Sequence, residues 1–189
     1  MHHIANLATF VRRQPTRIVL VGAPASTPET EYGWIEPGEP LGRIGADPVL
    51  HIKRFWEKPL QAQALACLAA GCLWNTFVLV AKLSTLLDAG RRLLPQLSQR
   101  MACATRFLSI GRALAAEREY GLTEKADFSR TILEARPSLL AVSPIPAVTW
   151  SDLGTPRMLL QTLQMMEPTI DAALEGARAK RSAAGSLSD

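Results

Sequence analysis

Long apolar runs are missing from this sequence. None of its 189 residues belongs to a stretch that approaches the roughly 20 consecutive apolar residues of a membrane-spanning helix. The first ten residues also lack the basic start and long apolar run of a signal peptide. We therefore expect a cytoplasmic protein with no membrane partner.

Cysteine is scarce, and Cys67, Cys72 and Cys103 are the three cysteines of the chain. Their number is odd and no pair has C-x-x-C spacing, which argues against a zinc site and against a disulfide framework. We expect reduced thiols, as is usual in the cytosol.

A concentration of charge is also absent. The chain has 21 Lys and Arg against 17 Asp and Glu, a formal net charge of +4, and the basic residues are scattered in short clusters. Nucleic-acid binding usually requires a basic stripe with interleaved aromatic residues. Its absence excludes nucleic acid as the expected partner and favours anions the size of a phosphate.

The composition that remains is that of an ordinary globular domain, with 48% apolar and 20% charged residues. The length fits one domain, which we expect over residues 1–181, followed by a small polar tail over 182–189 that frays.

Strands and helices are expected to alternate along the chain. The patterns predict strands over residues 17–22, 32–36, 49–57, 72–81 and 139–142. They predict helices over residues 4–13, 60–70, 84–94, 95–120 with a break near Gly111, 127–135, 155–167 and 169–181. Pro37-Gly38 is expected to end the second strand, Gly71 to cap the second helix, and Thr155-Pro156 to start a helix. This alternation predicts an α/β fold.

Four tryptophans each lie beside a polar or flexible residue, at an expected strand end or turn: Trp34, Trp56, Trp74 and Trp150. If these strand ends lie side by side, the tryptophans and their neighbours could line one ligand cleft, because α/β sheets bind ligands beyond their strand ends. The alternative is that the tryptophans fill the core.

The segments around these tryptophans resemble four motifs of one enzyme family. They are Pro28-Glu29-Thr30-Glu31-Tyr32-Gly33-Trp34-Ile35, Phe55-Trp56-Glu57-Lys58-Pro59, Leu73-Trp74-Asn75-Thr76 and Trp150-Ser151-Asp152-Leu153-Gly154. In order and spacing they are similar to the motifs of sugar-1-phosphate nucleotidyltransferases, in particular mannose-1-phosphate guanylyltransferases. The resemblance covers about residues 17–163.

The resemblance implies a three-layer, nucleotide-diphospho-sugar transferase-like fold, with a mixed sheet flanked by helices. It implies a reaction in which GTP and mannose-1-phosphate give GDP-mannose and pyrophosphate, with Mg²⁺ as cofactor and a sugar-1-phosphate as ligand.

The roles of individual residues also follow from the resemblance. Glu29 and Gly33 match positions that line the sugar pocket, and Asn75 matches one that binds the sugar. Glu57 matches the carboxylate on the sugar hydroxyls. Lys58, on the sugar phosphate, and Asp152, on the metal, match the catalytic positions. Without the resemblance, Glu57-Lys58 would be a solvated strand end, Asn75 a turn former and Asp152 a helix cap.

The sequence departs from the family pattern in three places. Glu31 stands where many relatives have glycine, and Thr76-Phe77-Val78 replaces a commoner S-G-M-F continuation. The glycine-rich G-x-G-x-R-L loop that binds nucleotide phosphates has no counterpart, nor does an upstream metal aspartate. We therefore expect a chain that lacks the N-terminal, Rossmann-like portion of the fold and binds a nucleoside triphosphate only if that portion is supplied.

Two other functions remain open at this stage. One is a catalytically inactive sugar-phosphate-binding subunit paired with a complete homologue, so that homo- or hetero-oligomers are both considered. The other is a fragment of a glucose-1-phosphate uridylyl- or thymidylyltransferase.

Overall fold

The computed structural model describes residues 2–45, 47–145, 150–160 and 162–164. The chain forms two compact units, Met1–Val148 and Thr149–Asp189, and each is described by itself. The domain expected over 1–181 stays a prediction, and the tail expected over 182–189 lies outside the described residues.

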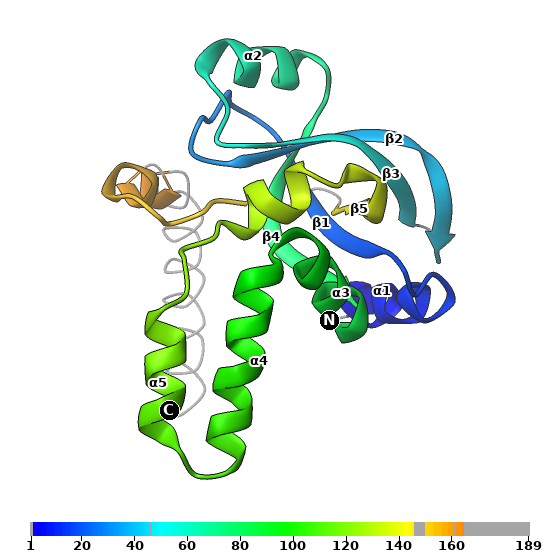
Figure 1. Ribbon diagram of the computed structural model, residues 1–189. Helices are drawn as coiled ribbons and strands as arrows, with labels where there is room; N and C mark the ends of the chain where they lie inside the picture. The colour runs from blue at the N-terminus through cyan, green and yellow to red at the C-terminus, as the bar shows by residue number, and fades with distance from the viewer. Residues whose placement is uncertain (1, 46, 146–149, 161, 165–189) are drawn as a thin grey trace, which may run out of the picture. The chain divides into compact units, whose positions relative to one another are not determined.

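The first unit is built on five strands (Figure 1): β1 (Ile18–Pro24), β2 (Gly33–Ile44), β3 (Asp47–Glu57), β4 (Leu73–Ala81) and β5 (Leu140–Pro144). Strand β1 runs antiparallel to β4 and parallel to β5, and β2 and β3 form a long antiparallel hairpin. Short antiparallel pairings of β2 with β4 and of β3 with β5 close the order β1-β4-β2-β3-β5 into a ring. The mixed sheet implied by the resemblance is confirmed.

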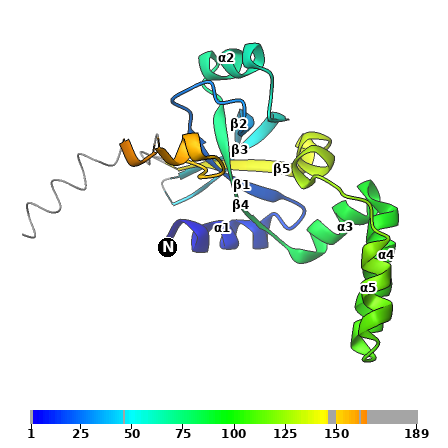
Figure 2. The ribbon, with the colours of Figure 1, turned by 90° about the vertical axis from the view of Figure 1, so that its left-hand side faces the viewer.

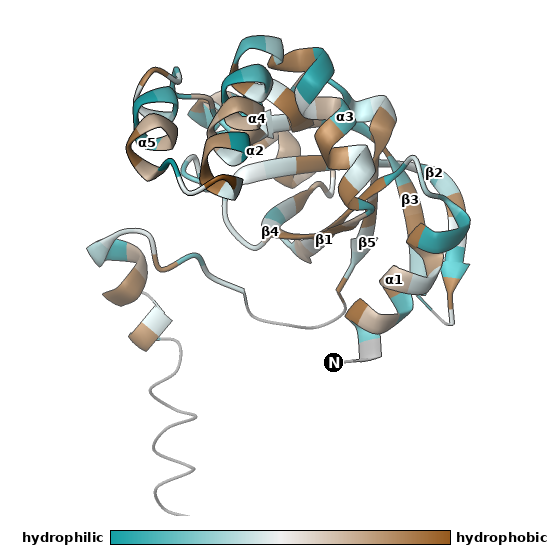
Figure 3. Cartoon of the chain, turned by 60° about the horizontal axis from the view of Figure 1, so that its bottom comes forward, coloured by the Kyte–Doolittle hydropathy of each residue, from teal (hydrophilic) through white to brown (hydrophobic). Residues whose placement is uncertain are grey.

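Helices cover both faces of β1, whose residues 18–23 are all buried. Ile18 and Leu20 pack in a cluster with α3 (Leu83–Leu93) and the π-helix η1 (Ser129–Glu134). Val19 and Val21 pack in another cluster with α1 (His2–Arg13). Burying one aliphatic side chain of this size stabilises a fold by about 1.5–3 kcal/mol. Hydrophobic residues dominate β1 and β5, whereas α3 also carries hydrophilic ones (Figure 3). The prediction of a buried strand over 17–22 is confirmed.

The remaining helices lie at the ends of the sheet. Helix α2 (Gln61–Ala69) lies at one end, and α4 (Pro95–Ser109) and α5 (Ala113–Gly121) run side by side at the other (Figures 1 and 2). Gly71 and Gly111 have φ of +71° and +72°, so the predicted α2 cap and the predicted break between α4 and α5 are confirmed. A short 3-10 helix, η2 (Pro137–Leu139), precedes β5. Among the described residues, no helix is long and apolar enough to cross a membrane.

One predicted boundary is wrong. Strand β2 does not end at Pro37-Gly38 but continues to Ile44, with register shifts between Glu36 and Gly42 that accommodate the prolines. Proline cannot donate to a ladder and is tolerated at such irregularities. The helix predicted over 127–135 is a π-helix, although the Asp127 carboxylate accepts from the Arg130 N–H at 3.1 Å as a cap should.

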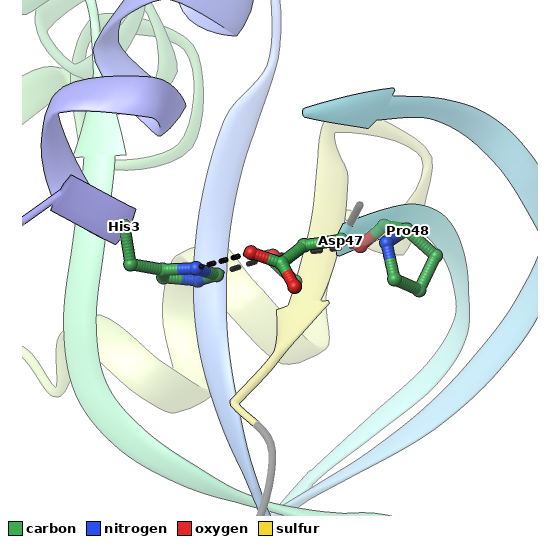
Figure 4. A network of polar contacts seen from close by, with 4 residues as sticks. His3, Asp47 and Pro48 are labelled. Atoms are coloured by element: carbon green, nitrogen blue, oxygen red, sulfur yellow. Dashed lines mark hydrogen bonds and ion pairs between the residues drawn. The ribbon is translucent and has the colours of Figure 1, made fainter. Parts of the chain in front are cut away.

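A polar tie joins α1 to the start of β3 and to β5 (Figure 4). His3 Nδ1 lies 3.1 Å from Asp47 Oδ2, and His3 Nε2 lies 3.2 Å from Ser143 Oγ. Ser143 Oγ also donates to the Pro48 carbonyl at 3.4 Å. The order serine, histidine, carboxylate is that of a hydrolase triad. However, Ser143 has no exposed surface, so the tie fastens α1 to the strands.

In the second unit, residues 156–160 and 162–164 are helical. Thr155 Oγ1 accepts from the Met158 N–H at 3.3 Å, which confirms the helix start predicted from Thr155-Pro156. The expected continuation to residue 167 and the helix expected over 169–181 lie outside the described residues.

Candidate functional site

Strand register brings three of the four motifs together. In the β2–β3 hairpin Gly33 lies opposite Glu57 and Trp34 lies opposite Trp56. On the other side of β2, Trp34 lies opposite Trp74 of β4. Segments far apart in the sequence thus meet at one place on the sheet.

Gly33 is the point of closest approach in this region. A Cβ atom added to Gly33 would lie 3.0 Å from Phe55 Cζ, 3.1 Å from Asn75 Cβ and 3.1 Å from Glu57 Oε2. Real Cβ atoms rarely have neighbours this near, so glycine is the residue that fits. The structure therefore brings both Glu57 and Asn75 close to Gly33.

The tryptophans of these strands belong largely to the core. Trp34 and Trp74 are buried, and their rings pack edge to face with centroids 6.1 Å apart. Tyr32 packs against Trp74 in the same way at 5.1 Å. The alternative that the tryptophans fill the core thus describes Trp34 and Trp74, while Trp56 is only half-buried.

Glu57, the last residue of β3, is half-buried among groups from η1. Burial raises the pKa of its carboxyl, because it removes water from the charged form, and the nearby Asp127 carboxylate raises it further. A hydrogen bond from the Ser129 side chain opposes this rise, as do the charges of Lys58 and Arg130. Glu57 is thus an acceptor whose charge depends on its neighbours.

Lys58 follows Glu57 in a left-handed backbone conformation, with φ of +50°. Its N–H donates to the Tyr32 carbonyl at 3.2 Å, which fixes this turn. Its ammonium Nζ lies 3.4 Å from Glu31 Oε2, and both side chains are about 50% exposed. The lysine predicted to bind phosphate therefore carries an accessible charge, and the non-family residue Glu31 is its ion-pair partner.

Asn75 and Glu29 are held by local bonds. Asn75 is buried within β4, and its Oδ1 accepts from the Phe77 N–H two residues on at 3.2 Å. The Trp34 indole Nε1 donates to the Glu29 carbonyl at 2.7 Å, which anchors the loop before β2 at its backbone.

Asp152 belongs to the second unit, so the structure does not place it beside Lys58. Its side chain is exposed, and Thr155 occupies the cap position of the following helix. A carboxylate is a ligand that Mg²⁺ accepts. Among the described residues, however, no three His, Cys, Asp or Glu side chains gather as a metal site. Asp152 thus supplies one suitable oxygen donor and not a complete site.

Sequence reasoning missed the surroundings of Glu57. Ser129 and Arg130 come from η1, which is separated from β3 in the sequence by α2, β4, α3, α4 and α5. The sequence predicts only that they belong to a helix. Asp127 was predicted only as a cap. No local pattern links these residues to β3, because only the tertiary fold packs η1 against that strand.

Several solved structures resemble the chain, among them two mannose phosphate enzymes. The crystal structure of mannose-1-phosphate geranyltransferase from Thermus thermophilus is 28% identical with a TM-score of 0.57, and the match covers 74% of this chain and 38% of that one. The crystal structure of mannose-6-phosphate isomerase from Helicobacter pylori is 18% identical with a TM-score of 0.60, and the match covers 80% of this chain and 57% of that one. The second likeness concerns the fold alone. The chain thus spans about two fifths of the length of the first protein and somewhat more than half of the length of the second.

A search of curated proteins finds no match. The family model described as nucleotidyl transferase matches residues 2–168, which is most of the chain and includes all four motifs. The chain therefore belongs to the nucleotidyl transferase family.

Proposed function

We propose that this chain carries the sugar-phosphate-binding part of a mannose-1-phosphate guanylyltransferase-type enzyme, together with one ligand of its metal ion. The reaction would transfer a guanylyl group from GTP to mannose-1-phosphate and release pyrophosphate. The observation that carries the proposal is that Glu57 and Asn75 both lie beside Gly33, and that Lys58, whose ammonium is half-exposed, directly follows Glu57 in the chain.

The chemistry of Glu57, Asn75 and Gly33 suits a sugar ligand. The Glu57 carboxylate accepts hydrogen bonds from two hydroxyls when it is ionised. Asn75 already uses its Oδ1 within the chain, so its Nδ2 would serve as the donor to a ring hydroxyl. Gly33, which has no side chain, lets the Glu57 carboxylate and Asn75 approach the β2 backbone closely. Glu29, on the anchored loop before β2, would add a further acceptor.

Lys58 would bind the phosphate of the sugar phosphate as a point charge. Its half-exposed ion pair with Glu31 is of a kind that contributes about 0–1 kcal/mol. A dianionic phosphate could therefore displace the Glu31 carboxylate from Lys58 with little loss of free energy. By fixing the phosphate, Lys58 would orient its oxygen for in-line attack on the nucleotide.

Asp152 would supply one carboxylate oxygen to Mg²⁺, a hard cation that neutralises phosphate charge when it is bound. The described residues do not complete such a site, so further oxygen ligands would have to join Asp152. Removing Asp152 is expected to leave sugar-phosphate binding by Lys58 unchanged.

The sugar is assigned from two sources. The motifs resemble those of enzymes that use mannose-1-phosphate, and the 28% identical relative is described as acting on mannose-1-phosphate. That relative is more than twice as long as the matched region, so its whole activity is transferred here only as a proposal.

The test is direct binding of mannose-1-phosphate, measured by isothermal titration calorimetry, to the wild type and to two lysine variants. Lys58→Ala should weaken binding by about tenfold to a hundredfold, because a hydrogen bond to a charged group contributes about 1.5–3 kcal/mol. Lys53→Ala is the matched control, since Lys53 is an exposed lysine of β3, the strand that Lys58 follows. Equal affinities of the Lys58 variant and wild type would refute the proposal.

The same titration distinguishes the alternatives. Tighter binding of glucose-1-phosphate than of mannose-1-phosphate would assign the chain to the uridylyl- or thymidylyltransferase type. Unphosphorylated mannose should bind much more weakly than either, because it offers nothing to Lys58.

A further inference from the structure

The turn between α2 and β4 has the hydrogen bonds of a Schellman motif. Gly71 adopts φ of +71° and its N–H donates to the Leu68 carbonyl at 3.1 Å. The Cys72 N–H donates to the Cys67 carbonyl at 3.0 Å. These are the two backbone bonds that define the motif, with Ala70 as its C-cap.

This motif brings together the side chains of the two residues that its longer bond joins. Here both residues are cysteines. Cys67 is 1% and Cys72 is 3% exposed, and their thiols hydrogen-bond to each other. A disulfide requires neighbouring Cα atoms about 4.4–6.8 Å apart. The backbone bond between these two residues keeps them close enough to meet this requirement with little movement.

The surroundings of the two sulfurs differ. Gln63 Nε2 donates to Cys67 Sγ at 3.4 Å, so an amide proton faces the sulfur on which negative charge would develop. Burial, together with the neighbouring Cys67, raises the pKa of the Cys72 thiol to about 12, so this thiol stays protonated at neutral pH. This arrangement favours Cys67 as the attacking sulfur and Cys72 as the resolving thiol.

We propose that Cys67 and Cys72 form a redox-sensitive dithiol that hydrogen peroxide converts into an intramolecular disulfide across the α2–β4 turn. Cys67 sulfur attacks one peroxide oxygen, the O–O bond breaks, and sulfenic acid and water form. The Cys72 sulfur then attacks the Cys67 sulfur, the S–O bond breaks, and a second water leaves. Two thiols are oxidised by two electrons and one peroxide is reduced.

The oxidised state would connect the last turn of α2 covalently to the residue that precedes β4. Both sulfurs are buried, so peroxide must reach them through local opening of α2, a helix of 9 residues. The disulfide would then form as a slow response to oxidant, and a thiol reductant would reverse it.

The experiment uses the Cys103→Ser variant, which removes the exposed cysteine and leaves Cys67 and Cys72. Folded protein is treated with peroxide, denatured, alkylated and digested with trypsin. No cleavable basic residue lies between Phe55 and Lys82, because Lys58 precedes proline, so both cysteines fall in one peptide. We expect that peptide to lose two hydrogens and to resist alkylation, and dithiothreitol to restore two alkylation sites.

Two further variants show whether the fold directs the reaction. Adding Cys72→Ser should abolish the hydrogen loss and leave Cys67 as its oxygen adducts. Adding Gly71→Ala, which strains the left-handed cap, should lower the ratio of disulfide to oxygen adducts several-fold, while Gly121→Ala should not change this ratio. Oxygen adducts on both cysteines without hydrogen loss, or two alkylated thiols after prolonged peroxide, would overturn the proposal.

Discussion

Lys58 combines a left-handed backbone with a half-exposed ammonium. A φ of +50° is uncommon for a residue with a side chain, and such conformations cluster at functional sites. The bond from its N–H to Tyr32 holds this turn at the end of β3. Local backbone geometry, and not only the charge, therefore sets where the ammonium points.

Glu31 should weaken sugar-phosphate binding, because its carboxylate competes with the phosphate for Lys58. Glu31→Gln keeps the shape of the side chain and removes the charge. We expect mannose-1-phosphate affinity to rise by up to about fivefold, in line with an exposed ion pair of about 1 kcal/mol. Glu39→Gln, an exposed glutamate of β2, is the control for net charge. Weaker binding by Glu31→Gln in calorimetry would mean that Glu31 positions Lys58 instead.

Glu57 should make ligand binding pH-dependent. Its pKa is raised, chiefly by burial, so as the pH falls the carboxylate is protonated earlier than an ordinary glutamate and loses its acceptors for sugar hydroxyls. Ser129→Ala removes a hydrogen bond that lowers this pKa. We expect the fall in affinity to move to higher pH in that variant.

Ser138→Ala, at an exposed serine of η2, is the control, because titration of the ligand phosphate affects all three proteins alike. The readout is the dissociation constant of mannose-1-phosphate against pH. Identical profiles for Ser129→Ala and wild type would contradict the assigned hydrogen bond.

At the scale of elements, local signals were sufficient for some boundaries and misleading for others. The apolar run 17–22 predicted a buried strand, and Gly71 and Gly111 marked real helix ends, because each signal acts on its own backbone. Pro37 gave a wrong strand end, because the pairing of β2 with β3 outweighs the local tendency of proline to end a strand.

Some residues of the candidate site could likewise be predicted from local signals, and others could not. Motif order pointed to Glu57 and Asn75, and strand register brings both to Gly33. Ser129 could not be predicted, since its contact with Glu57 depends on how η1 packs on β3.

Burial of β1 on both faces predicts a large stability effect of truncating one of its side chains. Leu20 has no exposed surface, so Leu20→Ala should lower the free energy of unfolding by about 2–5 kcal/mol. Leu114, which is 83% exposed on α5, is the matched control, and Leu114→Ala should change stability by less than about 0.5 kcal/mol. Urea denaturation followed by circular dichroism measures both. A loss below about 1 kcal/mol for Leu20→Ala would contradict the two-sided packing.

At the scale of the molecule, the chain corresponds to 38% of its mannose-1-phosphate relative. The residues that support the proposal are proposed to bind a sugar phosphate, and none of them is assigned to the nucleotide base. We therefore expect the purified chain to bind mannose-1-phosphate but to form no GDP-mannose with GTP and Mg²⁺. Chromatography of the reaction mixture measures the product. GDP-mannose formation above an Asp152→Asn control would show that the chain is an enzyme by itself.

The parallel pairing of β1 with β5 has a consequence for biosynthesis. Ile18 near the start of the chain has Leu140 as its partner, so β1 leaves the ribosome long before the strand it needs. During that interval β1 lacks the strand that pairs with its residues 18–22. Contacts between such distant residues form slowly. We expect the nascent chain to depend on chaperones until β5 emerges, because β5 completes the packing around β1.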